Sequence, residues 1–200
     1  MTHKGTKTLE TARLTLRRFC EGDINAAYRN WTSSDAVTKF LRWPTHQTVE
    51  TTATILRGWI DSYADPAFYQ WAIVPRNLGE PIGTLSVVSK DEKTKTVHIG
   101  YCIGEAWWDK GYMSEALAAV IAYFFGEVGV LRIESQHDPQ NPASGRVMQK
   151  CGMRYEGTLR QADWSNRGIV DACMYSLLAA EYGEKRGENG GNKSISESIL

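Results

Sequence analysis

VHIGYCIGEAWWDKGYMSEAL (residues 97–117) is the tightest passage from a strand-like run to a helix-like run in this chain. Its first part is typical of a strand, and its last part begins an apolar pattern at helical spacing. A helix that starts near Tyr112 leaves its first N–H groups without intrahelical partners, and those donors suit an anion. Gly111 leaves room for a ligand beside the backbone. On these local features alone, an ordinary helix start capped by Asp109 or Ser114 is the favoured interpretation.

The rest of the chain alternates between strand-like and helix-like patterns. The strand-like runs are 13–19, 68–75, 80–90, 97–104, 130–136, 153–161 and 169–178, and the main helix-like runs are 24–31, 48–63, 113–126 and 141–152. This order predicts a mixed α/β fold with about seven strands. We expect a single domain over residues 1–182, followed by a polar, Gly- and Ser-rich tail over residues 183–200.

The composition is that of a globular protein with no charge preference. Of the 200 residues, 42% are hydrophobic and 23% are charged, and the formal net charge is zero. Nothing in this balance favours binding to nucleic acid or to an anionic membrane. The four cysteines form no C-x-x-C pair, so we expect neither disulfides nor a cysteine-based zinc site. The polar N-terminus lacks the apolar segment of a signal peptide, and no apolar run approaches a membrane span, which predicts a cytoplasmic protein.

Several ordered blocks of the sequence together resemble the RimJ/RimL-like branch of the GNAT superfamily of N-acetyltransferases. The blocks are TARLTLRR (11–18), FLRWPTHQTVE (40–50), IGYCIGEAWWDKGYMSEAL (99–117), NPASGRVMQKCGMRYEG (141–157), EGTLRQAD (156–163) and VDACMYSLL (170–178). The resemblance implies a GNAT fold, in which a twisted, mostly antiparallel sheet carries helices on both faces and is splayed at the acetyl-CoA cleft. In that family the strand that corresponds to residues 97–104 bulges beside the splay.

The resemblance also implies where acetyl-CoA, the acetyl donor, would bind. The family's Q/R-x-x-G-x-G/A turn corresponds to Trp108–Met113, although Trp108 replaces the Gln or Arg and Met113 replaces the last small residue. Backbone N–H groups of this turn would hold the pyrophosphate, and the Ile103 N–H at the bulge would polarise the thioester carbonyl. The residues implied to contact the donor are Cys102, Ile103, Trp108, Lys110, Gly111, Tyr112, Met113, Ser114, Asn141 and Ser144.

Direct acetyl transfer to an amine requires a neutral amine, a donor for the developing oxyanion and a proton for the departing thiolate, but no metal. Asn141 and Ser144 match the family's N-x-x-S motif. The resemblance implies that Asn141 contacts the pantetheine arm and that Ser144 protonates the sulfur. Asn141 is also well placed to cap its helix, and the two roles are compatible.

For the general base, the resemblance points first to Asp163, which follows EGTLRQA, and then to Glu105 just beyond the splayed strand. The alternative for Asp163 is an ordinary solvated loop aspartate. His98 titrates near neutrality but alternates with apolar residues on a strand, so a structural place on the sheet face is the more common outcome. Tyr101, a single aromatic residue in the same strand, could pack on the pantetheine arm or the acceptor, but a place in the core is the favoured interpretation.

The resemblance implies that the acceptor is a protein N-terminal α-amino group, as in ribosomal proteins. A small amine such as a polyamine, an amino acid or an aminoglycoside is the alternative. We expect Trp43 and Trp164 to lie beside the acceptor, because one precedes a proline and the other lies in a turn. A hypothesis of another class is an acyl-CoA-binding regulatory module with weak or no catalysis. A homodimer is an expectation at the level of the family.

Overall fold

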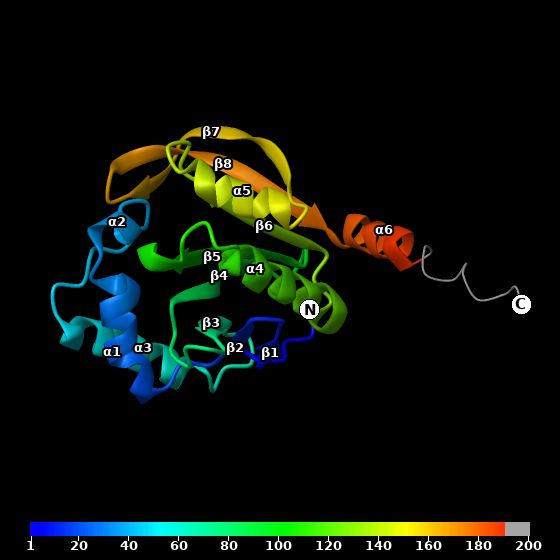
Figure 1. Ribbon diagram of the computed structural model, residues 1–200. Helices are drawn as coiled ribbons and strands as arrows, with labels where there is room; N and C mark the ends of the chain where they lie inside the picture. Colours follow the sequence, from blue (N-terminus) through cyan, green and yellow to red (C-terminus); the bar gives the residue numbers. More distant parts are fainter. Residues whose placement is uncertain (191–200) are drawn as a thin grey trace, which may run out of the picture.

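The computed structural model describes residues 1–190, which form an eight-stranded sheet with helices on both faces (Figure 1). The strand order is β1-β2-β3-β4-β5-β6-β8-β7, and only the β5–β6 pair is parallel. This confirms the mixed α/β, mostly antiparallel fold. The strands are β1 Leu9–Glu10, β2 Leu14–Arg17, β3 Gln70–Pro75, β4 Gly83–Asp91, β5 Thr96–Ile103, β6 Arg132–His137, β7 Arg154–Ser165 and β8 Gly168–Leu178. The two-residue β1 is the strand that the sequence patterns miss.

The α-helices of the described residues are α1 Ile24–Ala27, α2 Asp35–Thr38, α3 Val49–Ser62, α4 Tyr112–Tyr123, α5 Pro142–Lys150 and α6 Ala179–Gly190. The Thr48 side chain caps α3 by accepting from the Thr51 N–H at 3.4 Å, as its polar start predicts. α6 crosses residue 182, where the sequence predicts the domain to end, and residues 191–200 of the predicted tail lie outside the described residues. No helix in the described part of the chain is long and apolar enough to cross a membrane.

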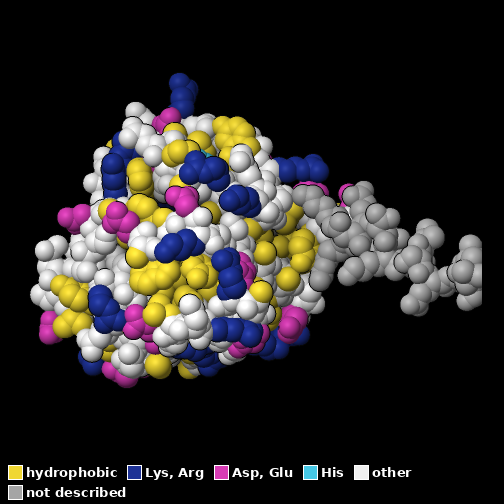
Figure 2. All heavy atoms as spheres, viewed as in Figure 1, with side chains coloured by type: hydrophobic (Ala, Val, Ile, Leu, Met, Phe, Trp, Pro, Cys, Tyr) yellow, Lys and Arg dark blue, Asp and Glu magenta, His cyan; other side chains and the backbone are white. Residues whose placement is uncertain are grey.

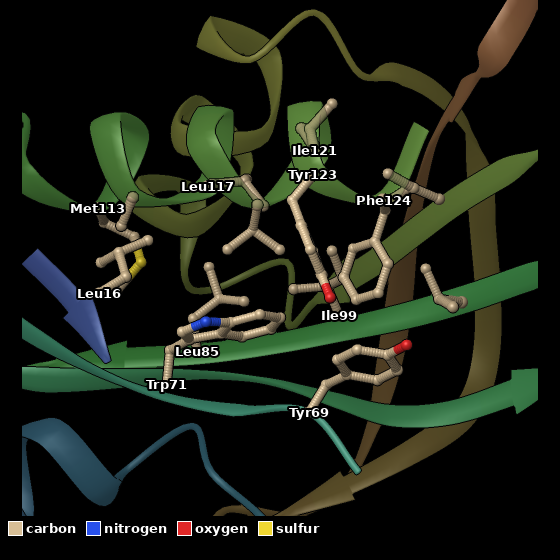
Figure 3. Packing of buried hydrophobic residues seen from close by; sticks show 14 of the residues in the cluster. Leu16, Tyr69, Trp71, Leu85, Ile99, Met113, Leu117, Ile121, Tyr123 and Phe124 are labelled. Atoms are coloured by element: carbon tan, nitrogen blue, oxygen red, sulfur yellow. The ribbon is translucent and has the colours of Figure 1, made fainter. Parts of the chain in front are cut away.

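The sheet is buried on both faces at its centre, which explains why β3 has no polar face. Trp71 points toward α4 and packs with Leu117 (Figure 3), and Ile73 belongs to the same apolar cluster. Ala72 and Val74, which alternate with them along β3, belong to a second cluster under α1 and α3. Alternation along a strand therefore gives each layer of helices its own core.

Strands β5 and β6 are paired only at their first residues. Their parallel register runs from Thr96–Arg132 to His98–Glu134. The Ser135 hydroxyl then donates to the Ile99 carbonyl at 2.8 Å. Beyond this point β5 stays with β4 and β6 stays with β8, so the two strands diverge. The predicted splay is therefore present at the centre of the sheet.

The bulge beside the splay is not where the resemblance implies. Ile103 pairs in regular register with Gly83, whereas the register of β4 and β5 shifts between Val87 and Ser89. The additional residue is thus Val88 on β4, and the expected bulge at Ile103 is wrong. The side chain of Val88 occupies the space that a β-carbon at Gly100 would need, because the two would lie 2.8 Å apart.

Gly104 ends β5 at a point where two backbone segments approach each other closely. A β-carbon on Gly104 would lie 2.2 Å from the Asn30 carbonyl oxygen and 2.9 Å from the Trp107 ring. Because the first of these neighbours is backbone, a side chain could be accommodated only by moving a chain segment.

We predict that Gly104→Ala destabilises the fold by about 1–3 kcal/mol through overpacking. The matched control is Gly126→Ala, whose new β-carbon would meet nothing within 4 Å. This control should leave the free energy of unfolding unchanged within about 0.5 kcal/mol or raise it slightly. Urea unfolding of both variants measures the difference, and equal midpoints would contradict the close approach.

Candidate functional site

Two cavities meet where β5 and β6 diverge. The first, which we call the turn cavity, has a volume of about 250 Å³ and lies between the starts of α4 and α5. The second, which we call the sheet cavity, has a volume of about 310 Å³ and is lined by β4, β5, β6 and the segment 40–43. Both cavities are lined by Phe40, Leu41, Tyr101, Cys102, Asn141 and Ser144. The divergence of the two strands thus creates one continuous site with two compartments.

The turn before α4 and the first residues of that helix line the turn cavity. Asp109 and Gly111 both have a left-handed backbone, with φ of 56° and 76°. No side chain caps the helix at Gly111, so neither Asp109 nor Ser114 fills the role that an ordinary helix start would give it. The first N–H groups of α4 therefore remain available to an anion, and the helix dipole adds to the attraction.

Arg13 on the neighbouring segment fixes this turn from outside. Its guanidinium donates to the Lys110 carbonyl at 3.0 Å and to the Glu115 carboxylate at 2.6 Å. The same group lies 4.5 Å from the centre of the Tyr112 ring. These contacts join the loop, the helix start and the N-terminal strand. Sequence reasoning misses Arg13, because nearly a hundred residues separate it from the turn.

Nine of the ten predicted donor-contacting residues line the turn cavity, and Lys110 is the exception. The Lys110 side chain is exposed, while its carbonyl is held by Arg13. The cavity is also lined by Arg146 and Lys150, which the sequence did not single out. They stand four residues apart on α5 and so share a helix face. Two cations on the wall of this cavity suit a ligand with several phosphates.

Ser144 lies at the junction of the cavities and is paired with Tyr101. The Tyr101 hydroxyl is 3.0 Å from both the Ser144 hydroxyl and the Ser144 carbonyl. Burial raises the pKa of the Tyr101 phenol, so this hydroxyl stays protonated over the physiological range. The expectation that Tyr101 belongs simply to the core was therefore incomplete, since it packs against the core and also lines both cavities.

Asn141 stands at the N-cap position of α5, but its side chain makes no capping hydrogen bond. It lines both cavities instead. Cys102 also lines both cavities, and burial raises the pKa of its thiol to about 12. Because the thiolate is the nucleophilic form, Cys102 is a neutral, inert wall residue rather than an acyl acceptor.

A bulge in β7 brings Asp163 into the sheet cavity. Leu159 pairs with Ala172 and Asp163 with Val170, so three residues of β7 stand opposite one residue of β8. The middle one, Gln161, has a left-handed backbone (φ 51°), and its N–H donates to the Asp171 carboxylate at 2.8 Å. This local distortion re-aims the side chain that follows, as β-bulges commonly do.

The carboxylate of Asp163 is already occupied by donors. Arg42 approaches one oxygen to 2.7 Å, and the Gln136 side-chain amide donates to the other. Glu105, the second candidate for the base, is exposed in a short turn after β5 and lines neither cavity. The structure therefore brings Ser144 and Asp163 to the site, and it leaves Glu105 outside it.

The segment 40–43 forms a wall of both cavities and is held by the turn of the β7–β8 hairpin. The Asn166 N–H donates to the Leu41 carbonyl at 3.0 Å, and its side-chain amide donates to the carbonyls of Thr38 and Trp43. Trp43 lines the sheet cavity as predicted. Trp164 does not, and its exposed fraction is 55%. Its position in the strand, one residue beyond Asp163, turns it to the opposite side.

Each carboxylate that lines the sheet cavity has a guanidinium partner. Arg42 pairs with Asp163, and Arg167 pairs with the buried Asp138 at 2.6 Å. Figure 2 shows acidic and basic side chains interspersed over one face of the molecule, without a large patch of either sign. Within residues 1–190, no group of three or more His, Cys, Asp and Glu side chains is arranged to hold a metal ion.

His98 also lines the sheet cavity, and its side chain is 13% exposed. Its Nδ1 lies 3.4 Å from a carboxylate oxygen of Glu134 on β6. Burial lowers the pKa of the imidazole, and the Glu134 carboxylate opposes this shift without cancelling it. The ring is thus neutral at physiological pH.

Comparisons with known proteins agree with this geometry. The model of a family described as "Acetyltransferase (GNAT) domain" matches residues 13–154. The N-acetyltransferase YoaA of Bacillus subtilis (strain 168) is 31% identical over 170 residues, which cover 85% of this chain and 96% of that protein. A ribosomal-protein-serine acetyltransferase of Escherichia coli (strain K12) is 30% identical over 99 residues, which cover 50% of this chain and 55% of that protein.

The solved structures give the same result for the fold. The RimL ribosomal L7/L12 α-N-protein acetyltransferase, in complex with coenzyme A, has a TM-score of 0.77 at 23% identity and covers 88% of this chain and 99% of that one. The regions that match these proteins thus cover most of this chain, which carries the two-compartment site at its splayed sheet. This chain belongs to the GNAT family of acetyltransferases and is an acetyl-transferring enzyme.

Proposed function

We propose that this enzyme transfers the acetyl group of acetyl-CoA to the α-amino group of a polypeptide N-terminus. The observation that supports this most is the meeting of the turn cavity and the sheet cavity at Tyr101, Asn141 and Ser144. A donor in one compartment and an acceptor in the other would come together at these residues. When bound, acetyl-CoA would supply the activated thioester.

The turn cavity fits the phosphates of coenzyme A. The left-handed backbone at Gly111 and the uncapped start of α4 present N–H donors. A β-carbon at this glycine would lie 3.5 Å from the Arg13 guanidinium, which holds the same turn. Arg146 and Lys150 add positive charge on the opposite wall. Backbone donors at a helix start with nearby cations are the arrangement that binds phosphate groups in many proteins.

Ser144 and Tyr101 are the groups that can serve the departing sulfur. Their hydroxyls are 3.0 Å apart, so a proton given up by Ser144 can be replaced from Tyr101. Because the phenol stays protonated over the physiological range, the pair remains a donor at any pH at which the enzyme would work.

The charges of the sheet cavity favour an acceptor with one amine over a polycation. The two carboxylates that line it are both paired with arginines, so they leave little negative potential for several ammonium groups. An α-amino group, with a pKa of about 7.7–8.0, is also easier to deprotonate than a lysine amine at about 10.4. The name of the Escherichia coli relative, which acts on a ribosomal protein, supports the same acceptor class.

In this proposal, Asp163 holds neighbouring segments in place and balances the charge of Arg42. The predicted role as general base is weakened by the donors that this carboxylate already accepts, because Arg42 and the Trp164 N–H contact one oxygen and Gln136 contacts the other. With Arg42 bound, Asp163 instead joins β7, β6 and the segment 40–43 around the acceptor compartment.

A panel of amines tests the proposed reaction. Peptides with a free N-terminal Ser or Ala should release thiol from acetyl-CoA and gain one acetyl group on the α-nitrogen, as measured by mass spectrometry. The same peptides with a blocked N-terminus and a free lysine are the controls and should react much more slowly. A clear preference for spermidine, amino acids or aminoglycosides would show that the acceptor is a small amine and not a peptide. Tight acetyl-CoA binding without any acetylated amine would instead indicate a binding module.

Substitution of Gly111 tests the site of the donor. Gly111→Asp should weaken CoA binding at least about tenfold more than Gly111→Asn, which corresponds to about 1.4 kcal/mol. The two side chains have the same shape and tolerate the left-handed backbone similarly, so the difference isolates the added negative charge. Isothermal titration with CoA gives both dissociation constants, and equal values for the two variants would place the pyrophosphate elsewhere.

Ser144→Ala should lower kcat on a reactive peptide by roughly 100-fold, with the acetyl-CoA dissociation constant changed by less than about threefold. Tyr101→Phe removes only the second hydroxyl and should give a smaller loss. Steady-state kinetics and titration calorimetry separate the two effects. If Ser144→Ala turned over at the wild-type rate, Ser144 would not be the residue that protonates the sulfur.

A further inference from the structure

We propose that His98 is the group that accepts the proton of the substrate amine, with Glu134 holding the imidazole ring in place. This inference rests on the proposed transfer to an amine and names the residue that carries out one of its steps. It is drawn from the sheet cavity, where His98 stands at the last position at which β5 is paired with β6.

The position of the ring determines which nitrogen is available. Nδ1 lies 3.4 Å from the Glu134 carboxylate, so this nitrogen carries the hydrogen in the neutral ring. Glu134 is in turn held by the Arg132 guanidinium at 3.1 Å. Nε2 is then the nitrogen with a free lone pair for an amine in the cavity. A carboxylate that fixes the tautomer and orientation of a histidine is a common device in general-base catalysis.

Charged groups face His98 from three elements. Glu134 on β6 and Asp163 on β7 favour the protonated ring, whereas Arg42 from the segment 40–43 and burial disfavour it. On the β4 side its register partner is the uncharged Ser89. Burial has the largest effect, so the ring is neutral and ready to accept a proton at physiological pH.

The other acid–base groups that line this cavity are engaged elsewhere. Donors from Arg42 and Gln136 occupy Asp163, and Arg167 and the Gln140 N–H occupy the carboxylate of Asp138. His137 uses its Nδ1 for the Asp138 carbonyl, and its Nε2 lies against Gly145, only 2.6 Å from where a β-carbon would be.

The proton and electron pairs balance in this scheme. An N–H bond of the substrate ammonium breaks, its proton forms an Nε2–H bond on His98, and the imidazolium later returns that proton to water. The amine nitrogen uses the freed pair to form the bond to the acetyl carbon. As that bond forms, the carbonyl π pair moves onto the oxygen. When the pair returns, the carbon–sulfur bond breaks and the sulfur takes a proton from the Ser144 hydroxyl. The nitrogen then loses its second proton to become an amide, and this proton replaces the one that Ser144 gave up. No oxidant, reductant or metal is consumed.

The first test uses a reactive N-terminal Ser or Ala peptide and the intact enzyme. His98→Ala should lose roughly 100-fold or more in kcat near pH 7 and less near pH 9, where the amine is already neutral. Added imidazole should restore activity in proportion to its concentration, which a purely structural role would not allow. Glu134→Gln should move the acidic limb of the pH–rate profile to lower pH, because it removes the carboxylate that favours the imidazolium. Asp163→Asn is the comparison variant and should move that limb by less than Glu134→Gln does, because Asp163 has the smaller effect on the ring.

Some outcomes would overturn the assignment. An unchanged pH–rate profile in His98→Ala would do so, and a profile altered only in Asp163→Asn would return the role to Asp163. Both outcomes leave acetyl transfer intact, so they differ from a failure of the proposed function, in which no amine is acetylated.

Nuclear magnetic resonance of the ¹⁵N-labelled imidazole tests the proposal without any acceptor. The His98 signals should report a neutral ring with hydrogen on Nδ1 at pH 7.5, and Glu134→Gln should lower the midpoint of its titration. A ring that is protonated throughout pH 7–8, or that carries its hydrogen on Nε2, would contradict the proposal.

Discussion

The partial pairing of β5 with β6 is the constraint on which the rest of the site depends. A parallel pair that continued to the ends of both strands would satisfy their backbone groups and close the middle of the sheet. Here the pairing stops at His98 and Glu134, and the Ser135 hydroxyl bonds to the next carbonyl. The strands can diverge because each keeps its other neighbour, β4 for β5 and β8 for β6. Both cavities lie in the space that this divergence opens.

The two compartments are built by different means. Backbone shapes the turn cavity, through the left-handed Asp109 and Gly111 and the uncapped start of α4, and Arg13 stabilises the turn from outside. Side chains from many separate parts of the chain line the sheet cavity, and the Arg42–Asp163 and Arg167–Asp138 ion pairs hold some of them. Because backbone N–H groups would bind the ligand, the side chains of this turn can vary. This explains how Trp108 and Met113 can occupy positions where the family's motif has other residues.

Charge neutrality inside the sheet cavity has a chemical consequence. Ion pairs of arginine with Asp138 and Asp163 join the walls of the cavity and offset the negative charge of both carboxylates. His98 differs because its partner Glu134 stands beside only one ring nitrogen and leaves the other free. His98 is thus the lining group best suited to take a proton, because burial keeps its ring neutral and one ring nitrogen is free.

The sequence by itself determined the turn at Gly111 and the order of all elements but the shortest. These properties are local: they depend on periodicity, on helix caps and on glycine. The mostly antiparallel sheet, and the choice of Asn141 and Ser144, followed from the resemblance of several ordered blocks to one family. Only the tertiary structure decided that Val88 rather than Ile103 is the bulged residue, that Tyr101 reaches Ser144, and that Arg42 occupies Asp163. Each of these joins residues that are distant in sequence, and their contacts are set by strand register and by the bulge in β7, which no local pattern encodes.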